Sequence, residues 1–249
     1  MSNARFLYTF KFDDAVITSS SEVSGLPDDN AVHDFVARKW RTTGDTGQWI
    51  KFDQGSAKKI TMAALFGHNL TSGATVTIQA NSEDSWEAPS YSQAMTWNEK
   101  AIVKFIDETY QWWRITFEDG SNPDEYIEIG RICAGEYIEP DVNVSENVSK
   151  QLIDPSVKEG NQGKQGNVIT RPKYRAFSVE FTGIARAQQD QLSAMFEAVG
   201  NTGPLVFALD PDNYPEEDTI YCEIQTQLGY ALGALAYGDV SLVFEEKTR

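Results

Sequence analysis

Short stretches of alternating apolar and polar residues dominate the first half of the chain. They cover residues 76–80, 113–117 and 127–129, and a fourth at 49–53 is followed by an apolar run at 60–66. Alternation with a period of two places every second side chain on one face, which is typical of half-buried β-strands. The pattern therefore predicts several short strands in this half.

Turn-forming residues separate these stretches. Four clusters occur, at 24–30 (SGLPDDN), 42–47 (TTGDTG), 71–73 (TSG) and 119–125 (DGSNPDE). Gly55 predicts a further tight turn between the strand at 49–53 and the run at 60–66. Many short strands without a long helical pattern favour an antiparallel β-sandwich over residues 1–140. Trp49 and Trp113 fall within predicted strands, and we expect both in the core.

The composition changes between residues 141 and 170. This stretch is polar, rich in Asn, Gln, Gly, Lys and Ser, and contains KEGNQGKQGN at 158–167. Such a sequence buries too little apolar surface to offset the entropy lost on ordering. We interpret it as a linker with a long mobile loop, and the alternative is a twisted hairpin that belongs to a second domain.

Residues 171–249 read as strand, helix and further strands. Phe177, Val179 and Phe181 share one face of a strand, and Gly200 is placed to end the helix. The helical spacing is carried by Leu192, Met195, Phe196 and Val199. Three more strands are expected at 203–211, 220–228 and 239–246. The prediction for this part is a small α+β domain, so that the whole chain is mainly β.

The charge of the chain restricts its partners. The net charge is -16, and both halves are acidic when the chain is divided at Pro140. This argues against specific nucleic-acid binding, which needs Lys and Arg to displace counterions. An acidic surface would suit a conduit through which DNA slides, or would serve solubility alone.

The sequence gives no sign of export or membrane insertion. Residues 1–14 contain Lys11, Asp13 and Asp14 where a signal peptide needs an apolar region, which predicts no export by that route. No apolar run is long enough to suggest a transmembrane helix.

Few residues are available for catalysis or metal binding. Cys133 and Cys222 are far apart, and we expect buried free thiols rather than a disulfide. The chain has only two histidines and no nucleophile elbow, phosphate loop or dinucleotide fingerprint, which predicts a non-enzyme without a cofactor. Asp28, Asp29, Asp45 and Asp84 are available to a structural calcium ion, but no spacing among them supports one. We expect the acidic run at 210–218 to be a solvated loop.

The first half resembles the discoidin-like, galactose-binding-like jelly roll. The resemblance is carried, in order, by segments at 15–22, 30–34, 39–44, 48–60, 76–86, 111–117 and 126–132. They include the Trp-Arg pair at 40–41 and the WIKFDQG motif at 49–55. The LFGHNL stretch at 65–70 is similar to the version of this domain found in phage tail proteins. The resemblance implies a jelly roll and, in some relatives, a bound glycan.

The second half resembles the distal tail and minor tail proteins of long-tailed bacteriophages. The similarity rests on the strand at 173–183, the helix-to-strand transition at 191–211 and the last strand at 240–246. It implies a tail-tube-like domain that forms a ring, hexameric in that family, which joins the tail tube to the host-facing tip. The implied partners are further copies of the chain and other tail proteins such as the tail tube and hub. The implied location is the virion tail tip, after synthesis in the host cytoplasm.

A carbohydrate site is the second functional hypothesis. Sugars need aromatic faces and a few polar groups, and Trp86, Tyr91 and Trp97 lie in a loop-like, Pro-containing segment. Alternatively, these tryptophans cover an end of the sandwich or pack at a subunit contact. His68 and Asn69 are further candidates, although a lone histidine after a strand often satisfies a backbone carbonyl. The two hypotheses are a structural component of a phage tail tip and a carbohydrate-binding adhesin or accessory module.

Overall fold

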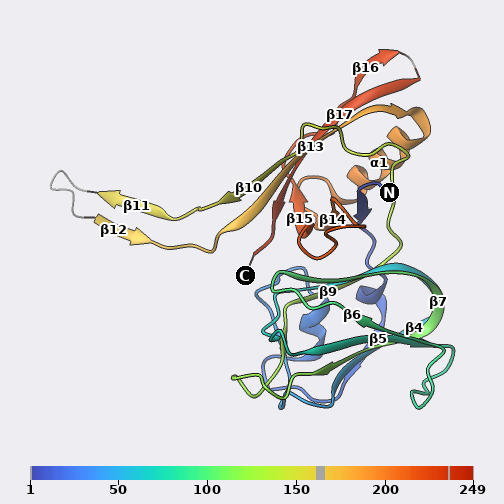
Figure 1. The fold of residues 1–249 in the computed structure, drawn as a ribbon, viewed down its shortest axis with the longest axis vertical. Helices are drawn as coiled ribbons and strands as arrows, with labels where there is room; N and C mark the ends of the chain where they lie inside the picture. Colours follow the sequence, from blue (N-terminus) through green and yellow to red (C-terminus); the bar gives the residue numbers. More distant parts are fainter. Residues whose placement is uncertain (1, 161–165, 235, 249) are drawn as a thin grey trace.

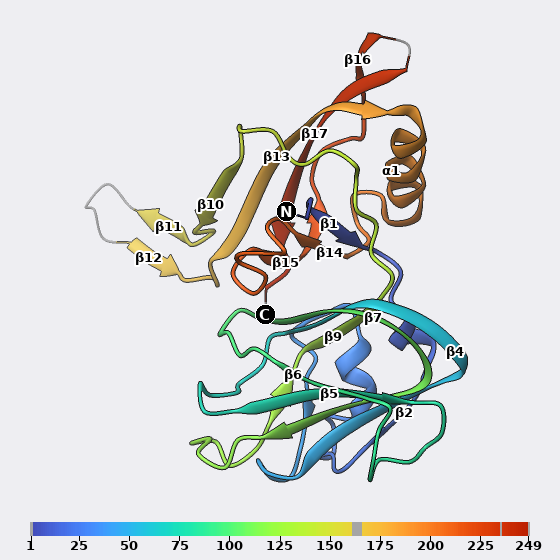
Figure 2. The same cartoon turned by 45° about the vertical axis from the view of Figure 1, so that its right-hand side comes forward.

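The computed structural model describes residues 2–160, 166–234 and 236–248. They form two units that lie one above the other in Figure 1, a β-sandwich below and an α+β unit above. A narrow two-stranded arm extends from the upper unit, away from the rest of the molecule (Figures 1 and 2).

The lower unit is the predicted antiparallel sandwich. Its main sheet has the order β2-β4-β7-β5-β6, with β9 also paired to β4, and a small second sheet joins β3 to β8. The bounds are β2 Val16–Ser19, β3 Trp40–Arg41, β4 Gln48–Phe66, β5 Thr75–Asn81, β6 Tyr91–Met95, β7 Ala101–Glu118, β8 Glu128–Ile129 and β9 Arg131–Gly135. Two 3-10 helices, η1 Lys11–Asp14 and η2 Asp28–Val32, also belong to this unit.

β4 is one long bent strand, so the expected turn at Gly55 is wrong. The strand runs for 19 residues, and its pairing with β7 shifts register between Asp53 and Lys58. Gly55 sits in this bulge with a φ of 67°, a left-handed conformation that glycine adopts without steric cost. The glycine therefore bends the sheet instead of ending the strand.

In the sandwich, every second residue of a strand faces the core. Ile50 and Phe52 point inward from β4, and Trp113 points inward from β7, where it is completely buried. Trp113 was correctly predicted as a core residue. Trp49 is only partly buried and lies outside the core, which corrects the prediction for that residue. Because alternate residues face opposite sides, Trp49 cannot share the inward face with Ile50.

The upper unit contains one helix that packs against an antiparallel sheet with strands of unequal length. The sheet order is β1-β14-β15-β17-β13-β10, and β16 pairs with β17. The bounds are β1 Arg5–Leu7, β10 Ser149–Ile153, β13 Tyr174–Ala185, α1 Arg186–Val199, β14 Leu205–Ala208, β15 Thr219–Ile224, β16 Ala231–Ala234 and β17 Tyr237–Glu246. α1 ends at Gly200, as predicted, where φ is 57°.

The upper unit takes a strand from the beginning of the chain, which the expected boundary at residue 140 did not include. β1 pairs with β14, with Phe6 opposite Phe207. The Phe6 ring lies 5.1 Å from that of Phe207 and 5.9 Å from those of Phe181 and Phe244. Residues 171–249 alone therefore lack both edge strands of this sheet, β1 and β10, and a central core side chain of the unit.

Three short strands lie within the polar stretch at 141–170. β10 pairs with β13 from Ser149↔Ser178 to Ile153↔Tyr174. β11 (Val157–Gly160) pairs with β12 (Gly166–Ile169) as a separate two-stranded sheet. The pairing of β11 with β12 agrees with the hairpin alternative, and the part of the expected mobile loop at 161–165 lies outside the described residues. We call β10, β11, β12 and the chain up to Arg175 the arm.

A buried joint connects the two units. Met62, Ala64 and Phe66 of β4 pack in one cluster with Val206 and Tyr221 of the upper unit. At its edge Arg131 is completely buried, 2.8 Å from the carboxylate of Asp13, and the Tyr221 hydroxyl donates to the Asp34 carbonyl at 3.1 Å. The units therefore share a continuous apolar contact, without a flexible tether between them.

Candidate functional site

The five residues predicted to bind carbohydrate lie at two separate places on the sandwich. Trp97, His68 and Asn69 are near the start of β5, whereas Trp86 lies in the loop after its end. The five-residue strand β6 runs between Trp86 and Trp97, and a strand of that length spans about 17 Å. The expected loop at 82–97 also contains this strand. The five side chains do not converge on one ligand.

The group at the start of β5 is held by contacts within the protein. His68 Nε2 lies 3.0 Å from the Asn98 carbonyl oxygen, the arrangement considered as the alternative to a ligand contact. The Trp97 indole N–H donates to the Leu70 carbonyl at 3.0 Å, and the Asn69 amide donates to the Tyr126 carbonyl at 3.0 Å. These side chains close the end of the sandwich.

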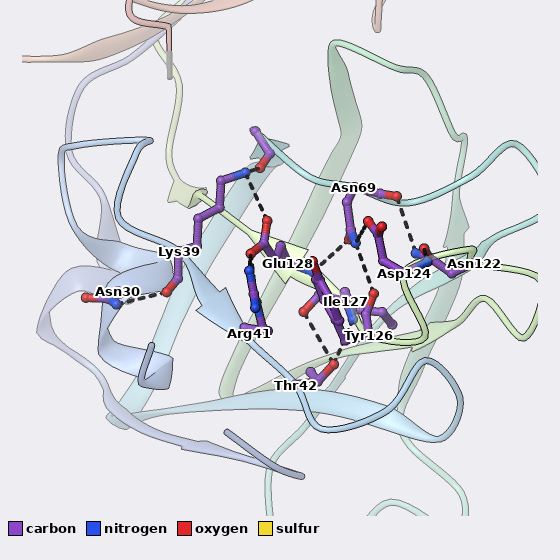
Figure 3. Close-up of polar contacts among 11 residues, drawn as sticks. Asn30, Lys39, Arg41, Thr42, Asn69, Asn122, Asp124, Tyr126, Ile127 and Glu128 are labelled. Atoms are coloured by element: carbon purple, nitrogen blue, oxygen red, sulfur yellow. Dashed lines mark hydrogen bonds and ion pairs between the residues drawn. The ribbon is translucent and has the colours of Figure 1, made fainter. Parts of the chain in front are cut away.

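Figure 3 shows the polar network around Asn69. Arg41 Nε donates to Glu128 at 2.8 Å, and the Arg41 guanidinium lies 4.2 Å from the ring centre of Tyr126. Asn69 accepts from the Glu128 backbone N–H at 2.7 Å and donates to Asp124 at 3.0 Å. The network joins β3, β8 and two loops, and its hydrogen-bonding groups are used to hold them together.

Trp86 and Tyr91 have different surroundings. Tyr91 packs on the sandwich core, with its ring 6.3 Å from that of Trp113. Trp86 lies over Arg114, whose guanidinium carbon is 4.5 Å from the ring centre, and its indole N–H donates to Asp84 at 2.6 Å. Of the predicted residues, Trp86 is the one held on the outer face of the main sheet.

Two further tryptophans share that outer face. Trp49 of β4 and Trp112 of β7 are both partly exposed, and Lys51 lies between them with its ammonium 5.3 Å and 5.7 Å from the two ring centres. Lys51 and Arg114 are direct partners in the β4–β7 register. We call Trp49, Trp86 and Trp112 with Lys51, Gln79, Asp84 and Arg114 the tryptophan face.

Charged and amide groups fix the geometry of the tryptophan face. Lys51 forms an ion pair with Asp84 at 2.8 Å, and its hydrogen bond holds the pKa of that carboxyl below its usual value. Arg114 donates to Gln79 at 2.9 Å and 2.7 Å. Partial burial lowers the pKa of the Arg114 guanidinium, which stays charged at neutral pH. The face thus presents aromatic surface beside ordered hydrogen-bonding groups.

The sequence interpretation missed most of this face. Trp49 was expected in the core, and Trp112 was not singled out. The alternation along β4 could have revealed it, because Trp49 lies on the opposite side of the strand from Ile50 and on the same side as Lys51. A charged neighbour two residues away marks the solvent side of a strand.

A second candidate is a cleft of about 490 Å³ between the two units. His68 and Asn69 line it from the sandwich, and Lys173 and Arg175 line it from the upper unit. Arg175 donates to Glu246 at 3.0 Å, and Lys173 lies 3.7 Å from Asp154. The charges of the cleft are therefore largely compensated by the protein itself.

Metal and thiol chemistry have little support in this structure. Within residues 2–160, 166–234 and 236–248, no group of three or more His, Cys, Asp or Glu side chains is arranged to hold a metal ion. Cys133 and Cys222 are both buried free thiols, as predicted, and burial raises the pKa of Cys133 to about 12. Neither thiol is exposed for reaction.

Several solved structures are similar to part of this chain. No protein-family model and no curated protein matches the chain. Similar solved structures include a chitosan-binding module in complex with chitotriose, from a chitosanase/glucanase of Paenibacillus sp. IK-5, with 19% identity and a TM-score of 0.40. The family 32 carbohydrate-binding module of C. perfringens NanJ in complex with galactose has 14% identity and a TM-score of 0.42.

A third similar structure is the lectin domain of Lectinolysin complexed with Lewis B antigen, with 13% identity and a TM-score of 0.42. The matches cover 51%, 54% and 51% of this chain and 99%, 99% and 95% of the chitosan-binding, NanJ and Lectinolysin chains. All three neighbours are carbohydrate-binding proteins by their names, and none of the three is named as a phage tail protein. Their ligands are properties of those proteins.

Over the described residues, no helix is both long and apolar enough to cross a bilayer.

Proposed function

We propose that the protein binds carbohydrate through the tryptophan face of its β-sandwich. The observation that carries the proposal is the grouping of three partly exposed tryptophans around Lys51 and Arg114. Indole rings cover the C–H faces of sugars, and the amide and charged groups beside them suit sugar hydroxyls. The protein acts in this proposal as a binding module without catalytic activity.

The face is ordered before a ligand arrives. Asp84 accepts from both Lys51 and Trp86, and Gln79 holds Arg114 in place. Ordering the side chains in advance reduces the entropy lost on binding. Trp49 and Trp112 are both partly exposed, so part of each indole ring remains accessible to a ligand.

The test is binding of the whole chain to a glycan array, followed by titration of the best ligands. Trp86→Ala and Trp112→Ala should each weaken binding at least about tenfold, which corresponds to about 1.4 kcal/mol. The matched control is Phe35→Ala, because Phe35 is a 59% exposed aromatic residue outside the tryptophan face. Absence of glycan binding, or equal losses with Phe35→Ala, would overturn the proposal.

A second candidate function is a structural component of a phage tail tip or baseplate, built by self-assembly. The observation that favours assembly is the arm, which extends from the body and exposes apolar side chains (Figure 1). The tail-tip location rests on the sequence resemblance of the second half. In this proposal the upper unit joins copies into a ring with the tail tube and hub, and the sandwich remains available to host glycans.

Assembly is tested by sedimentation velocity of the whole chain over a wide range of concentrations. The proposal expects a concentration-dependent oligomer, and addition of a tail-tube protein should promote it. A monomer under all these conditions would contradict the assembly function without affecting glycan binding.

A further inference from the structure

The outer part of the arm is a two-stranded ribbon without a supporting layer. β11 and β12 pair only with each other, with Val157 opposite Ile169 and Lys158 opposite Val168. Val168 is 58% exposed and Ile169 is 49% exposed, so both faces of the ribbon carry bare apolar side chains. An isolated two-stranded hairpin is only marginally stable in water, and a partner surface would stabilise it.

The charge of the arm is opposite to that of the molecule. Residues 149–175 contain six Lys and Arg against two acidic residues, whereas the whole chain carries -16. Lys158 and Arg171 are exposed on this segment. An apolar and basic element on an acidic protein is complementary in charge to another copy of the same protein.

The upper unit also has a groove that is suited to an apolar and basic segment such as the arm. A groove of about 270 Å³ is lined by Val144 and Val148 from the segment before β10, and by Leu209, Asp210 and Tyr214 after β14. Lys150 of β10 and Asp218 also line it, and these two side chains form an ion pair with each other. The loop at 210–218 contains five acidic residues and no Lys or Arg. Its Tyr214 side chain is 57% exposed. The groove therefore has apolar walls beside a loop whose acidic residues, apart from Asp218, are not paired with Lys150.

We propose that the arm of one copy docks in this groove of a second copy of the chain. Val157, Val168 and Ile169 of the arm would contact the apolar walls, and Lys158 and Arg171 would face the acidic loop beside them. The inference rests on the assembly function proposed above and is independent of glycan binding. Reciprocal docking gives a closed dimer, and head-to-tail docking gives a ring or filament.

A charge-reversal experiment on the whole chain tests the contact. The arm variant Lys158→Glu/Arg171→Glu reverses two exposed cations. The groove variant Glu146→Lys/Asp212→Lys reverses two exposed acids on the two segments that form the groove. Each variant should weaken self-association at least about a hundredfold in sedimentation equilibrium, because like charges then oppose each other. The combination of both variants should restore association.

Two controls make the result specific. Arg38→Glu/Lys59→Glu, at exposed sandwich residues, changes the net charge by the same amount as the arm variant and should leave association unchanged. Raising salt from about 0.05 M to about 0.5 M should weaken the wild-type oligomer more than the charge-reversed one.

The possible outcomes distinguish failure of the docking inference from failure of the proposed assembly function. The docking inference is wrong if the arm and groove variants leave self-association unchanged, or if combining them does not restore it. The proposed assembly function would stand in either case. A wild-type chain that remains monomeric overturns both. Restoration by the combined variants supports the contact, because a folding defect in either part would not be repaired by the other.

Discussion

The same chain builds two kinds of β-structure with opposite environments. In the sandwich, β4 pairs with β7 along most of its length and with β2 and β9 on its other side, and its inward side chains are fully buried. In the arm, β11 pairs only with β12 and its apolar side chains face solvent. The sandwich completes its own hydrogen bonding and burial, whereas the arm requires another molecule to do so.

The role of a strand residue depends on which face of the sheet its side chain occupies. On β7, Trp113 is completely buried and its neighbour Trp112 is part of the tryptophan face. Identical side chains therefore serve stability on one side of the sheet and recognition on the other.

Backbone hydrogen exchange should separate the two regions most clearly. In dilute solution, amides of β11 and β12 should exchange at least about a thousandfold faster than those of β7, because local opening of an unsupported hairpin costs little free energy. Raising the protein concentration should slow exchange in the arm and leave β7 unchanged. Arm amides as protected as those of β7 in the monomer would show that the ribbon is stable alone.

Truncation of the two adjacent tryptophans should give unequal losses of stability. Trp113→Ala should lower the free energy of unfolding by about 3–5 kcal/mol, because it empties a site packed against Phe12 and Tyr110. Trp112→Ala should cost about 1 kcal/mol. Urea denaturation of both variants measures the difference, and equal losses would contradict the assignment of their faces.

The joint between the units should respond to pH through Asp13. Burial raises the pKa of this carboxyl to about 6, against the attraction of Arg131. The folded state then holds a proton that the unfolded state releases near pH 3.8. The stabilisation is complete below that pH and is lost as pH rises through about 6.

Comparison with Asp13→Asn isolates this effect from other carboxylates. Between about pH 4.5 and about pH 7, the wild type should lose more unfolding free energy than the variant. Equal changes in thermal or urea denaturation would show that Asp13 does not titrate in this range.

Trp49→Ala should have the smallest effect on stability. The side chain is partly exposed and outside the core, so we expect a loss of about 1 kcal/mol or less. Glycan affinity should fall with this variant, because its ring belongs to the tryptophan face. A loss of stability similar to that of Trp113→Ala would show that Trp49 belongs to the core.

The regular parts of the fold were predictable from the sequence. Period-two alternation predicted the sandwich strands, and helical spacing with Gly200 predicted α1 and its end. These signals are local, because they depend on side chains a few residues apart. β1 was missed because three residues carry no reliable pattern, and its pairing with β14 is a long-range contact.

The errors at the candidate site have a related cause. Trp49 was assigned from its residue type instead of its parity relative to Ile50. Trp86 and Trp97 were grouped because they are close in sequence, although β6 separates them in space. The polar composition of the arm concealed two strands, because a ribbon that buries nothing by itself has no apolar periodicity to detect. The tail-tip hypothesis rests on the sequence resemblance and stays a proposal.

The position of β1 has a consequence for synthesis on the ribosome. Arg5 pairs with Ala208, so the partner of this strand is translated about 200 residues later, roughly 10–40 s at usual rates of elongation. During that interval Phe6 and Leu7 have no completed sheet to enter. The sandwich can fold meanwhile and hold this segment near its final place, because Ile138 bonds to Phe6 through both backbone groups. We therefore expect the nascent chain to fold from its middle outward, with the upper unit closing last around its oldest strand.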